Sequence, residues 1–343
     1  MEFSDFKTPG THSFSKKLQK LSFALSFLAV ITIIFEFGFK HSDYVEYVIR
    51  MFHFSVLFFG IISILFRYLF THEKFLRKVR VFDGFIITIF SLLLLVQIDA
   101  VSSFLSFLDF FNKMGWVYLA ILIYFIREFS VVRLNFKREY LNPAQLFIVS
   151  FLLIILLGTL LLMLPKATHS GISLIDALFT STSAVCVTGL IVVDTGTYFT
   201  QFGQGIIAIL IQAGGLGIMT FASYFSYFFR GQSSYESQLM IKDITNSEKI
   251  GEVFSVLKKI IFVTFLVEFI GGIFIYFSIE KEVVGTFSER LFFSIFHTIS
   301  AFCNAGFSTL ENSLYEPEFR FNYSLQLIIV ALFTLGGIGF PIL

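Results

Sequence analysis

Long apolar segments separated by short polar ones run through the whole sequence. A helix that crosses a lipid bilayer needs about 20 mostly apolar residues. The segments that meet this pattern are 21–39, 48–70, 81–98, 116–132, 143–164, 200–229, 260–279 and 323–343. Two further apolar segments, 173–190 and 290–307, are too short or too polar to be full spans, and each lies between two full spans. The pattern therefore predicts an all-α integral membrane protein with two re-entrant loops.

The basic residues predict the orientation of these spans. They gather at the N-terminus, after the second span, around the end of the fourth and after the sixth. The groups are Lys7, Lys16, Lys17 and Lys20; residues 74–80; residues 127–138; and Arg230, Lys242, Lys249, Lys258 and Lys259. With a cytoplasmic N-terminus, every group lies on the cytoplasmic side, as Lys and Arg prefer. We therefore expect a multi-pass protein of the plasma (inner) membrane whose re-entrant segments enter from outside.

Composition excludes several other classes of protein. Hydrophobic residues make up 56% of the chain and charged residues 14%, against about 25% charged in an ordinary soluble domain. The net charge of +1 gives no reason to expect a nucleic-acid partner. Two cysteines imply no disulfide framework and, alone, make a poor metal site. We expect a partner in the lipid bilayer, no bound cofactor and no enzymatic activity.

An internal repeat includes both re-entrant segments. Residues 179–190 read FTSTSAVCVTGL and residues 296–307 read FHTISAFCNAGF. The coincident pairs are Phe179 and Phe296, Ser183 and Ser300, Ala184 and Ala301, Cys186 and Cys303, and Gly189 and Gly306. A glycine run follows each segment, GGLG at 214–217 and GGIG at 336–339. The predicted repeat unit is therefore a span, a re-entrant loop and a second span.

This unit has the design of a cation-channel pore loop. Irregular backbone at membrane depth is tolerated only where it lines a cavity or is buried in protein. Carbonyl oxygens after a short pore helix replace the hydration shell of an ion, and glycine permits the unusual backbone angles. The sequence predicts filters at about 185–190 and 302–307, holding potassium by backbone carbonyls only. The predicted ion-binding residues are Cys186, Val187, Thr188, Gly189, Cys303, Asn304, Ala305 and Gly306.

On these motifs the chain resembles the Trk/Ktr/HKT potassium transporter superfamily, over about residues 141–343. Segment 183–190 resembles its first filter, segment 297–307 its second, and the glycine runs are similar to its second pore-unit helices. In that family a glycine in the first filter accompanies potassium selectivity and a serine accompanies sodium transport. The resemblance therefore implies a potassium transporter through Gly189. It also implies a homodimer and cytoplasmic nucleotide-binding regulatory subunits.

The chain departs from this family in the number of pore units. The family has four, whereas two are predicted here. We expect an N-terminal domain of about four helices (1–138), pore unit one (139–230), a cytoplasmic connector (231–259) with a short amphipathic helix near Leu239, and pore unit two (260–343), cut off in its last helix. A piece of a longer product and a two-unit chain that dimerises into a four-unit pore are both open.

Charged residues in the N-terminal domain suggest a further role. They are Glu36, Arg50, Asp83, Asp99, Arg127 and Arg133. Ionisable residues within spans are functional candidates, and four helices with arginines on the last are similar to a voltage sensor. Arginines that reach from helix ends to the membrane surface explain the same residues, so both interpretations stay open.

Several alternatives accompany the transport hypothesis. The glycines of the two runs could serve as hinges or allow close packing; they are Gly214, Gly215, Gly217, Gly336, Gly337 and Gly339. Asp176 and Asp194 could concentrate cations or be solvated loop charges. The chain could be a non-conducting sensor or assembly subunit, or a sodium-permeable member of the superfamily. An intramembrane enzyme using Ser300 and His297 is disfavoured because no triad is evident.

Overall fold

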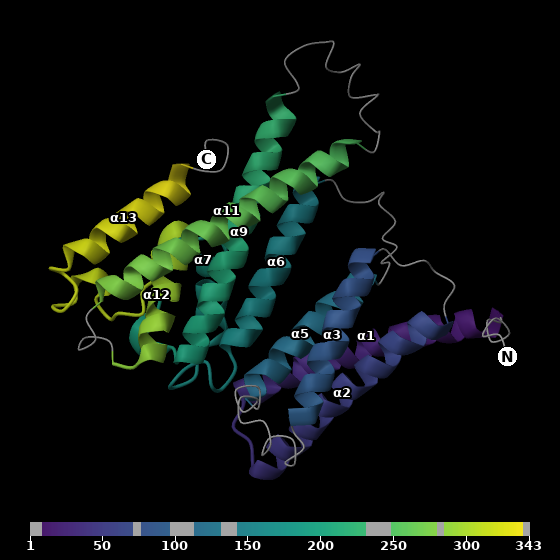
Figure 1. Cartoon of the computed structure of the whole chain (residues 1–343). Coiled ribbons are helices and arrows are strands. Elements are labelled where there is room, and N and C mark those ends of the chain that lie inside the picture. Colours follow the sequence, from purple (N-terminus) through teal and green to yellow (C-terminus); the bar gives the residue numbers. More distant parts are fainter. Residues whose placement is uncertain are drawn as a thin grey trace. The chain divides into compact units, whose positions relative to one another are not determined.

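The chain folds into α-helices throughout the part that the structure describes (Figure 1). This computed structural model describes residues 9–70, 77–96, 113–131, 143–230, 248–279 and 285–338. Within these ranges, the other elements are a 3-10 turn, Ser313–Tyr315, and an isolated β-bridge between Thr168 and Phe199. The predicted all-α class is therefore confirmed. The chain divides into two compact units, Met1–Arg138 and Glu139–Leu343.

Five helices among the described residues are long and apolar enough to cross a bilayer. They contain the segments Lys17–Gly38, Asp43–Leu69, Val79–Val96, Gln201–Ile218 and Leu257–Ser278. The other predicted spans, 116–132, 143–164 and 323–343, coincide with helices whose described apolar parts fall short of that standard. The last of these, α13 (Tyr323–Ile338), has 16 described residues, about 24 Å of helix against a hydrocarbon core of about 30 Å. The chain is a multi-pass membrane protein.

The N-terminal unit is a bundle of packed helices. Its described helices are α1 (Pro9–Gly38), α2 (Asp43–Phe70), α3 (Arg77–Val96) and α5 (Met114–Val131). Helix α1 begins at a proline, which suits the first helical position because no partner is needed for its missing N–H. The buried core includes Leu57, Phe90 and Tyr124. At Gly60 a Cβ would lie 2.7 Å from the Phe90 ring, so this glycine lets α2 approach α3 closely.

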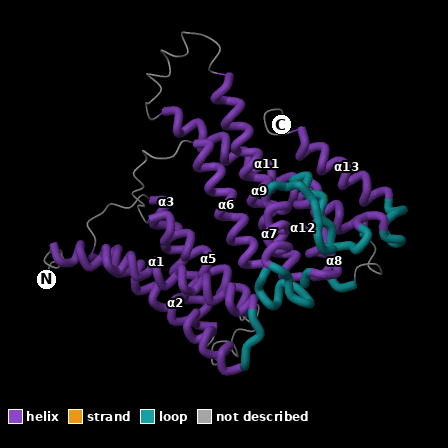
Figure 2. Tube along the Cα trace, turned by 180° about the vertical axis from the view of Figure 1, so that it is seen from behind, coloured by secondary structure: helices purple, strands orange, loops and turns teal. Residues whose placement is uncertain are grey.

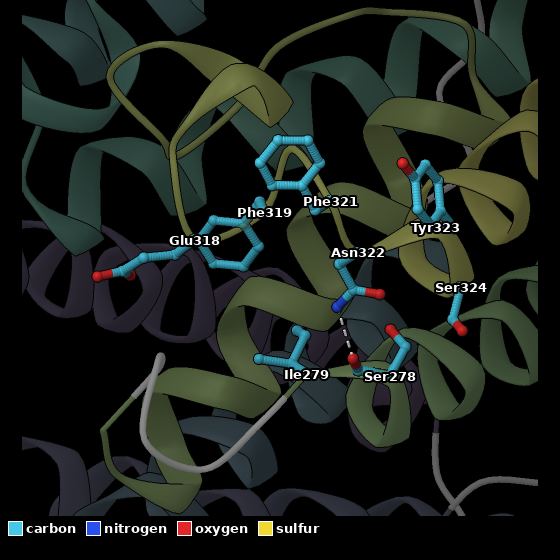
Figure 3. Close-up of a pocket in the computed structure, with 8 residues that line it drawn as sticks. All are labelled: Ser278, Ile279, Glu318, Phe319, Phe321, Asn322, Tyr323 and Ser324. Atoms are coloured by element: carbon cyan, nitrogen blue, oxygen red, sulfur yellow. Dashed lines mark hydrogen bonds between the residues drawn. The ribbon is translucent and has the colours of Figure 1, made fainter.

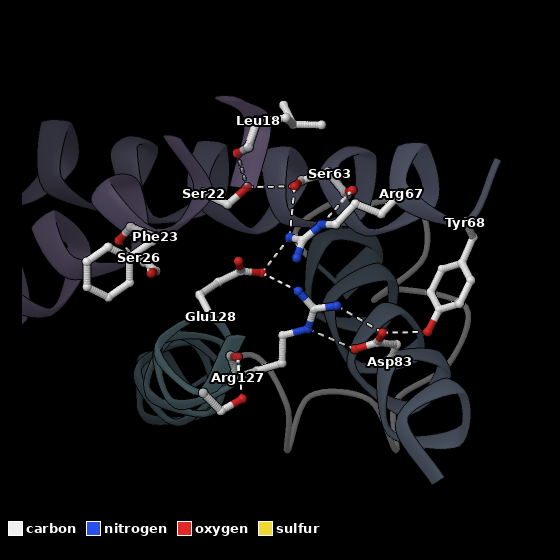
Figure 4. A network of polar contacts seen from close by, with 11 residues as sticks. Leu18, Ser22, Phe23, Ser26, Ser63, Arg67, Tyr68, Asp83, Arg127 and Glu128 are labelled. Carbon is white, nitrogen blue, oxygen red and sulfur yellow. Dashed lines mark hydrogen bonds and ion pairs between the residues drawn. The ribbon is translucent and has the colours of Figure 1, made fainter. Parts of the chain in front are cut away.

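A network of buried ion pairs joins three helices of this bundle (Figure 4). The Arg127 guanidinium donates from Nε and Nη2 to the two Asp83 carboxylate oxygens, each at 2.9 Å. Arg127 Nη1 and Arg67 Nη2 both donate to Glu128 Oε1, at 2.7 and 2.6 Å. The Tyr68 hydroxyl donates to Asp83 at 2.6 Å. Two positive and two negative side chains therefore balance in the bundle interior.

These contacts test only part of the voltage-sensor hypothesis. Arg127 is buried and paired rather than reaching toward water. Glu36 accepts a hydrogen bond from the Tyr118 hydroxyl at 2.5 Å. Arg133 and Asp99 lie outside the described residues, so the arginine spacing on which voltage sensing depends is untested.

Among the described residues, the second unit contains two sets of three helices. The middle helix of each set, with 12 and 16 residues, is called the short helix of that set. The first set is α6 (Pro143–Leu162), α7 (Leu174–Val185) and α9 (Gln201–Arg230), with the short α8 (Thr195–Tyr198) before α9. The second set is α11 (Glu248–Ser278), α12 (Phe287–Phe302) and α13. Helices within each set pack on one another, and α9 also packs on α11 and α12. Loops return from each short helix to the next element (Figure 2).

The predicted connector 231–259 overlaps the second set. Residues 248–259 already belong to α11, which starts before the predicted span. A polar sequence does not stop a helix that continues into an apolar one, because Lys and Glu are good helix formers. The predicted amphipathic helix near Leu239 lies outside the described residues.

Side-chain caps fix where the two short helices begin. Ser173 caps α7 by accepting from the Asp176 N–H at 3.1 Å. Thr286 and Glu289 form a reciprocal capping box at the start of α12. Buried Arg290 then donates to the carbonyls of Tyr276 and Ile279, both at 2.8 Å, at the end of α11. These contacts hold α12 against the preceding helix.

Candidate functional site

Both short helices end in the same kind of left-handed turn. The residues with positive φ after α7 and α12 are Val187 (56°), Gly189 (71°), Asn304 (60°) and Gly306 (74°). Left-handed backbone is easy for glycine and uncommon for other residues. The turns therefore repeat in backbone shape, even though the first left-handed residue is Val in one and Asn in the other.

The same hydrogen bonds close both turns. They run from Val187 N to Ala184 O at 3.2 Å, Thr188 N to Ser183 O at 2.9 Å, Asn304 N to Ala301 O at 2.9 Å and Ala305 N to Ser300 O at 2.8 Å. This pairing is the Schellman motif, which satisfies the last carbonyls of a helix. The turns direct their N–H groups back into the helices from which they emerge.

The carbonyl oxygens of the turns are left unpaired. No described residue donates a hydrogen bond to the carbonyls of 186–189 or 303–306. Each turn also stands at the C-terminal end of a helix, where the helix dipole places partial negative charge. Free carbonyls at a negative helix end form a favourable environment for a cation.

The two turns lie against each other. A Cβ at Gly189 would overlap the carbonyl oxygen of Ala305 and would lie 3.6 Å from the Cα of Gly306. A Cβ at Gly306 would meet nothing within 4 Å among the described residues. Glycine at 189 is thus required for the close approach of the two turns, and Gly306 faces open space.

The glycine runs pack behind these turns. A Cβ at Gly214 would overlap the Val185 carbonyl, and one at Gly336 would overlap the Phe302 carbonyl. Val185 and Phe302 are the last residues of α7 and α12, so the two contacts are equivalent. A Cβ would lie 2.6 Å from Cys303 Sγ at Gly215, 2.9 Å from the Phe151 ring at Gly217 and 3.8 Å from Asn304 at Gly337. These distances favour close packing; the hinge hypothesis stays untested, and Gly339 lies outside the described residues.

Polar side chains behind the turns bond locally. The Thr188 hydroxyl donates to Ser183 Oγ at 3.0 Å, and Ser300 Oγ donates to the Phe307 carbonyl at 2.6 Å. The two His297 ring nitrogens lie 2.9 Å from the Phe293 carbonyl and 3.0 Å from Ser308 Oγ. No hydrogen bond joins His297 to Ser300 among the described contacts. The arrangement that an intramembrane enzyme would need is therefore not made.

The two aspartates near the first turn lie at helix starts: Asp194 is the N-cap of α8, and Asp176 lies in the first turn of α7. Asp176 accepts from Ser173 Oγ at 2.7 Å at the start of α7. Asp194 accepts from the Thr197 N–H at 2.7 Å at the start of α8. Both are only partly buried, so capping does not exclude an additional effect on nearby cations.

The described residues form neither a disulfide nor a cluster of metal ligands. Cys186 and Cys303 are free thiols, and no group of three His, Cys, Asp or Glu side chains is close enough to hold a metal within the described ranges. A cavity of about 480 Å³ lies where α11 ends and α13 begins, and there Asn322 Nδ2 donates to Ser278 O at 2.7 Å (Figure 3). Its lining includes no residue of the two turns.

In the second unit, one buried acidic residue was not singled out from the sequence. Glu268 lies within α11 and its exposed fraction is 8%. A carboxylate inside an apolar span is itself a signal of function.

Repeated helix sets with paired turns that present free carbonyls define the class of the protein, a multi-pass α-helical membrane protein. The family model described as "TrkH: Cation transport protein" matches residues 113–343. Since this is more than half of the chain, the chain belongs to the TrkH cation transport protein family, within the predicted superfamily. Residues 1–112 lie outside the match.

Curated relatives agree with this assignment. Ktr system potassium uptake protein B of Bacillus subtilis is 41% identical over 202 residues, which cover 59% of this chain and 44% of the relative. Potassium/sodium uptake protein NtpJ of Enterococcus hirae is 37% identical over 205 residues, 59% and 45% of the two chains. Ktr system potassium uptake protein D of Bacillus subtilis is 34% identical over 218 residues, 62% and 47%. The chain spans about half the length of the curated relatives it matches.

Proposed function

We propose that this chain carries potassium ions across a membrane along a path lined by the backbone carbonyls of the two turns. The observation that carries the proposal is the approach of Gly189 to Ala305, which brings two sets of unpaired carbonyls together at the ends of α7 and α12. The names of the relatives, potassium uptake proteins, support the same cargo. The ion-binding residues proposed here are those predicted from the sequence, 186–189 and 303–306.

Potassium rather than sodium is proposed because glycine stands at position 189. A larger residue there would overlap the opposite turn and change the spacing of the carbonyls. One relative, however, is named a potassium/sodium uptake protein. Sodium permeability is therefore the second candidate, and it differs from the first only in the ratio of the two fluxes.

The assembly follows from the number of units. Two units are proposed to provide half of the path, with further units of the same kind completing it. We propose a homodimer with cytoplasmic nucleotide-binding regulatory subunits, located in the inner membrane with the N-terminus in the cytoplasm. The names of two relatives place them in a Ktr system, which supports a multi-component assembly.

Potassium uptake by cells that lack their own uptake systems tests the proposal. Wild-type protein should restore uptake, and Gly189→Ser should reduce the potassium-to-sodium uptake ratio about tenfold or more, equivalent to about 1.4 kcal/mol. Gly306→Ser should also alter flux, because φ at Gly306 is positive. Both variants should still insert in the membrane.

A matched control is available in the same unit. Gly171 also has positive φ, at 82°, but a Cβ there would meet nothing within 4 Å and the residue is outside the turns. Gly171→Ser should therefore keep the wild-type ion ratio. Unchanged uptake in both turn variants would refute the proposal, and wild-type protein that inserts but moves no ion would favour a non-conducting subunit.

A further inference from the structure

Three polar side chains on α9 and α11 carry buried atoms that have no hydrogen-bond partner among the described residues. They are Gln212 on α9 and Thr264 and Glu268 on α11. The unpartnered atoms are both polar atoms of the Gln212 amide, Thr264 Oγ1 and Glu268 Oε1. Thr264 and Glu268 are only 1% and 8% exposed. We call this set the α9–α11 polar cluster.

Its members are arranged to face one another. Thr264 and Glu268 are four residues apart, so they lie on one face of α11. Helix α9 packs on α11, and the Gln212 amide lies near the Glu268 carboxylate, although neither Gln212 polar atom meets the geometry of a hydrogen bond. Carboxylate, hydroxyl and amide oxygens therefore gather from two helices.

Thr264 differs from most buried hydroxyls within the helices of the second unit, although buried Thr180 and Thr195 also have a hydroxyl without a partner. Several of the others donate to the carbonyl one helical turn earlier. Examples are Thr159 to Ile155 at 2.8 Å, Ser294 to Arg290 at 2.7 Å and Thr298 to Ser294 at 2.6 Å. Thr264 makes no such bond, so its oxygen remains available to a ligand.

The cluster lies near the second turn. Gly215 follows Gln212 by one turn of α9, and a Cβ there would lie 2.6 Å from Cys303 Sγ. The Glu268 carboxylate acts electrostatically on the same thiol. A charge held in the cluster would therefore be felt at the turn that contains Asn304 and Gly306.

We propose that the α9–α11 polar cluster binds an alkali cation, at a site separate from the turn carbonyls. Carboxylate, hydroxyl and amide oxygens are ligands for hard cations, and no thiolate or imidazole is needed. An unpaired carboxylate inside a membrane is costly, and a bound Na⁺ or K⁺ neutralises it. The site stands on its own geometry; only its consequence, a positive charge that weakens ion binding at the second turn, rests on the proposed function.

Thermal unfolding of the purified full chain tests the site. Raising NaCl or KCl from 1 to 100 mM, with choline chloride keeping ionic strength constant, should raise Tm by about 3 °C or more through mass action. Glu268→Gln and Thr264→Val should each lose most of this shift. Glu36→Gln and Thr159→Val, the same chemical changes elsewhere in the chain, should keep it.

The outcomes separate this site from the turns. If Glu268→Gln and Thr264→Val kept the full shift while Gly189→Ser lost it, the cation would be bound at the turns alone and the inference would be overturned. Equal Tm values in all three salts would also overturn it. If Glu268→Gln did not fold, Thr264→Val, which removes only a hydroxyl, would decide. A cluster-dependent shift in a protein that transports no potassium would retain the site and refute the proposed function.

Discussion

Val187 is the most strained residue of the two turns. A β-branched side chain at positive φ is a clear outlier, and such conformations cost about 1–3 kcal/mol each. Asn304 occupies the equivalent place at lower cost, because its short polar side chain tolerates left-handed backbone. The strain is therefore concentrated in the first turn.

Replacing Val187 with glycine should relieve this strain. The gain of about 1–3 kcal/mol is opposed by the added chain entropy of about 0.5–1 kcal/mol and by the loss of a partly buried side chain that packs on the core. Val187→Ala loses the same packing and keeps the strain, so Val187→Gly should be the more stable of the two variants by about 1 kcal/mol. Unfolding of both variants in detergent, followed by Tm, checks this expectation, and a lower Tm for Val187→Gly than for Val187→Ala would contradict it.

Residue identity alone did not reveal that Val187 is more strained than Asn304. The aligned segments showed which residues correspond, including Gly189 and Gly306. The φ of Val187 depends on the hydrogen bonds that close the turn, and the contact between Gly189 and Ala305 depends on how two distant helices pack. Neither can be obtained from local preferences.

At the scale of the elements, α9 shows how closely a helix can approach a turn. Gly214→Ala would force a methyl group into the Val185 carbonyl and should destabilise the protein by about 1–3 kcal/mol, as overpacking does. A Cβ at Gly205, on the same helix, would meet nothing within 4 Å among the described residues. Gly205→Ala should therefore be neutral or stabilise by up to about 1 kcal/mol through helix propensity.

Chemical or thermal unfolding of the two alanine variants measures the difference. Equal stability would show that α9 shifts away from α7 without cost. The same comparison on α13 uses Gly336→Ala, whose methyl would meet the Phe302 carbonyl, so the two halves of the repeat provide independent measurements.

Apolar length and the repeat were sufficient to predict most of these helices. The short helices α7 and α12 fall within the segments predicted to be re-entrant or begin slightly before them. Helix α11 begins ahead of the predicted span 260–279, because a polar helical segment before a span has no apolar signal. Helix ends are set by capping contacts such as that of Thr286 with Glu289, which a search for apolar length does not consider.

At the scale of the whole molecule, charge balance governs the N-terminal unit. Asp83→Asn or Arg127→Met alone would leave an unbalanced charge in the bundle, at a cost of about 3–5 kcal/mol. The double variant restores balance between Arg67 and Glu128 and should lose less than the sum of the single changes. A double-mutant cycle on Tm or unfolding free energy measures this coupling, and simple additivity would contradict it.

The sequence identified Asp83 and Arg127 as charged residues within spans but not as a pair. Their contact joins α3 to α5, and residues that meet through packing of separate helices leave no signature in one sequence. Buried Arg67 and Glu128 were missed for the same reason. The family match begins at residue 113, so Arg127 and Glu128 lie within it and Arg67 and Asp83 lie outside it.

The direction of the turn hydrogen bonds affects which sign of ion charge the turns can bind. In both turns the N–H groups of the residues that follow the helix point back to carbonyls inside it. Anions are bound in proteins by backbone N–H groups that converge outward, and no such donor is left here at 187–188 or 304–305. Chloride would thus find none of these four N–H groups free to bind it. Under the proposed function, this discrimination against anions belongs to the main chain and should survive side-chain changes in the turns that leave the backbone intact.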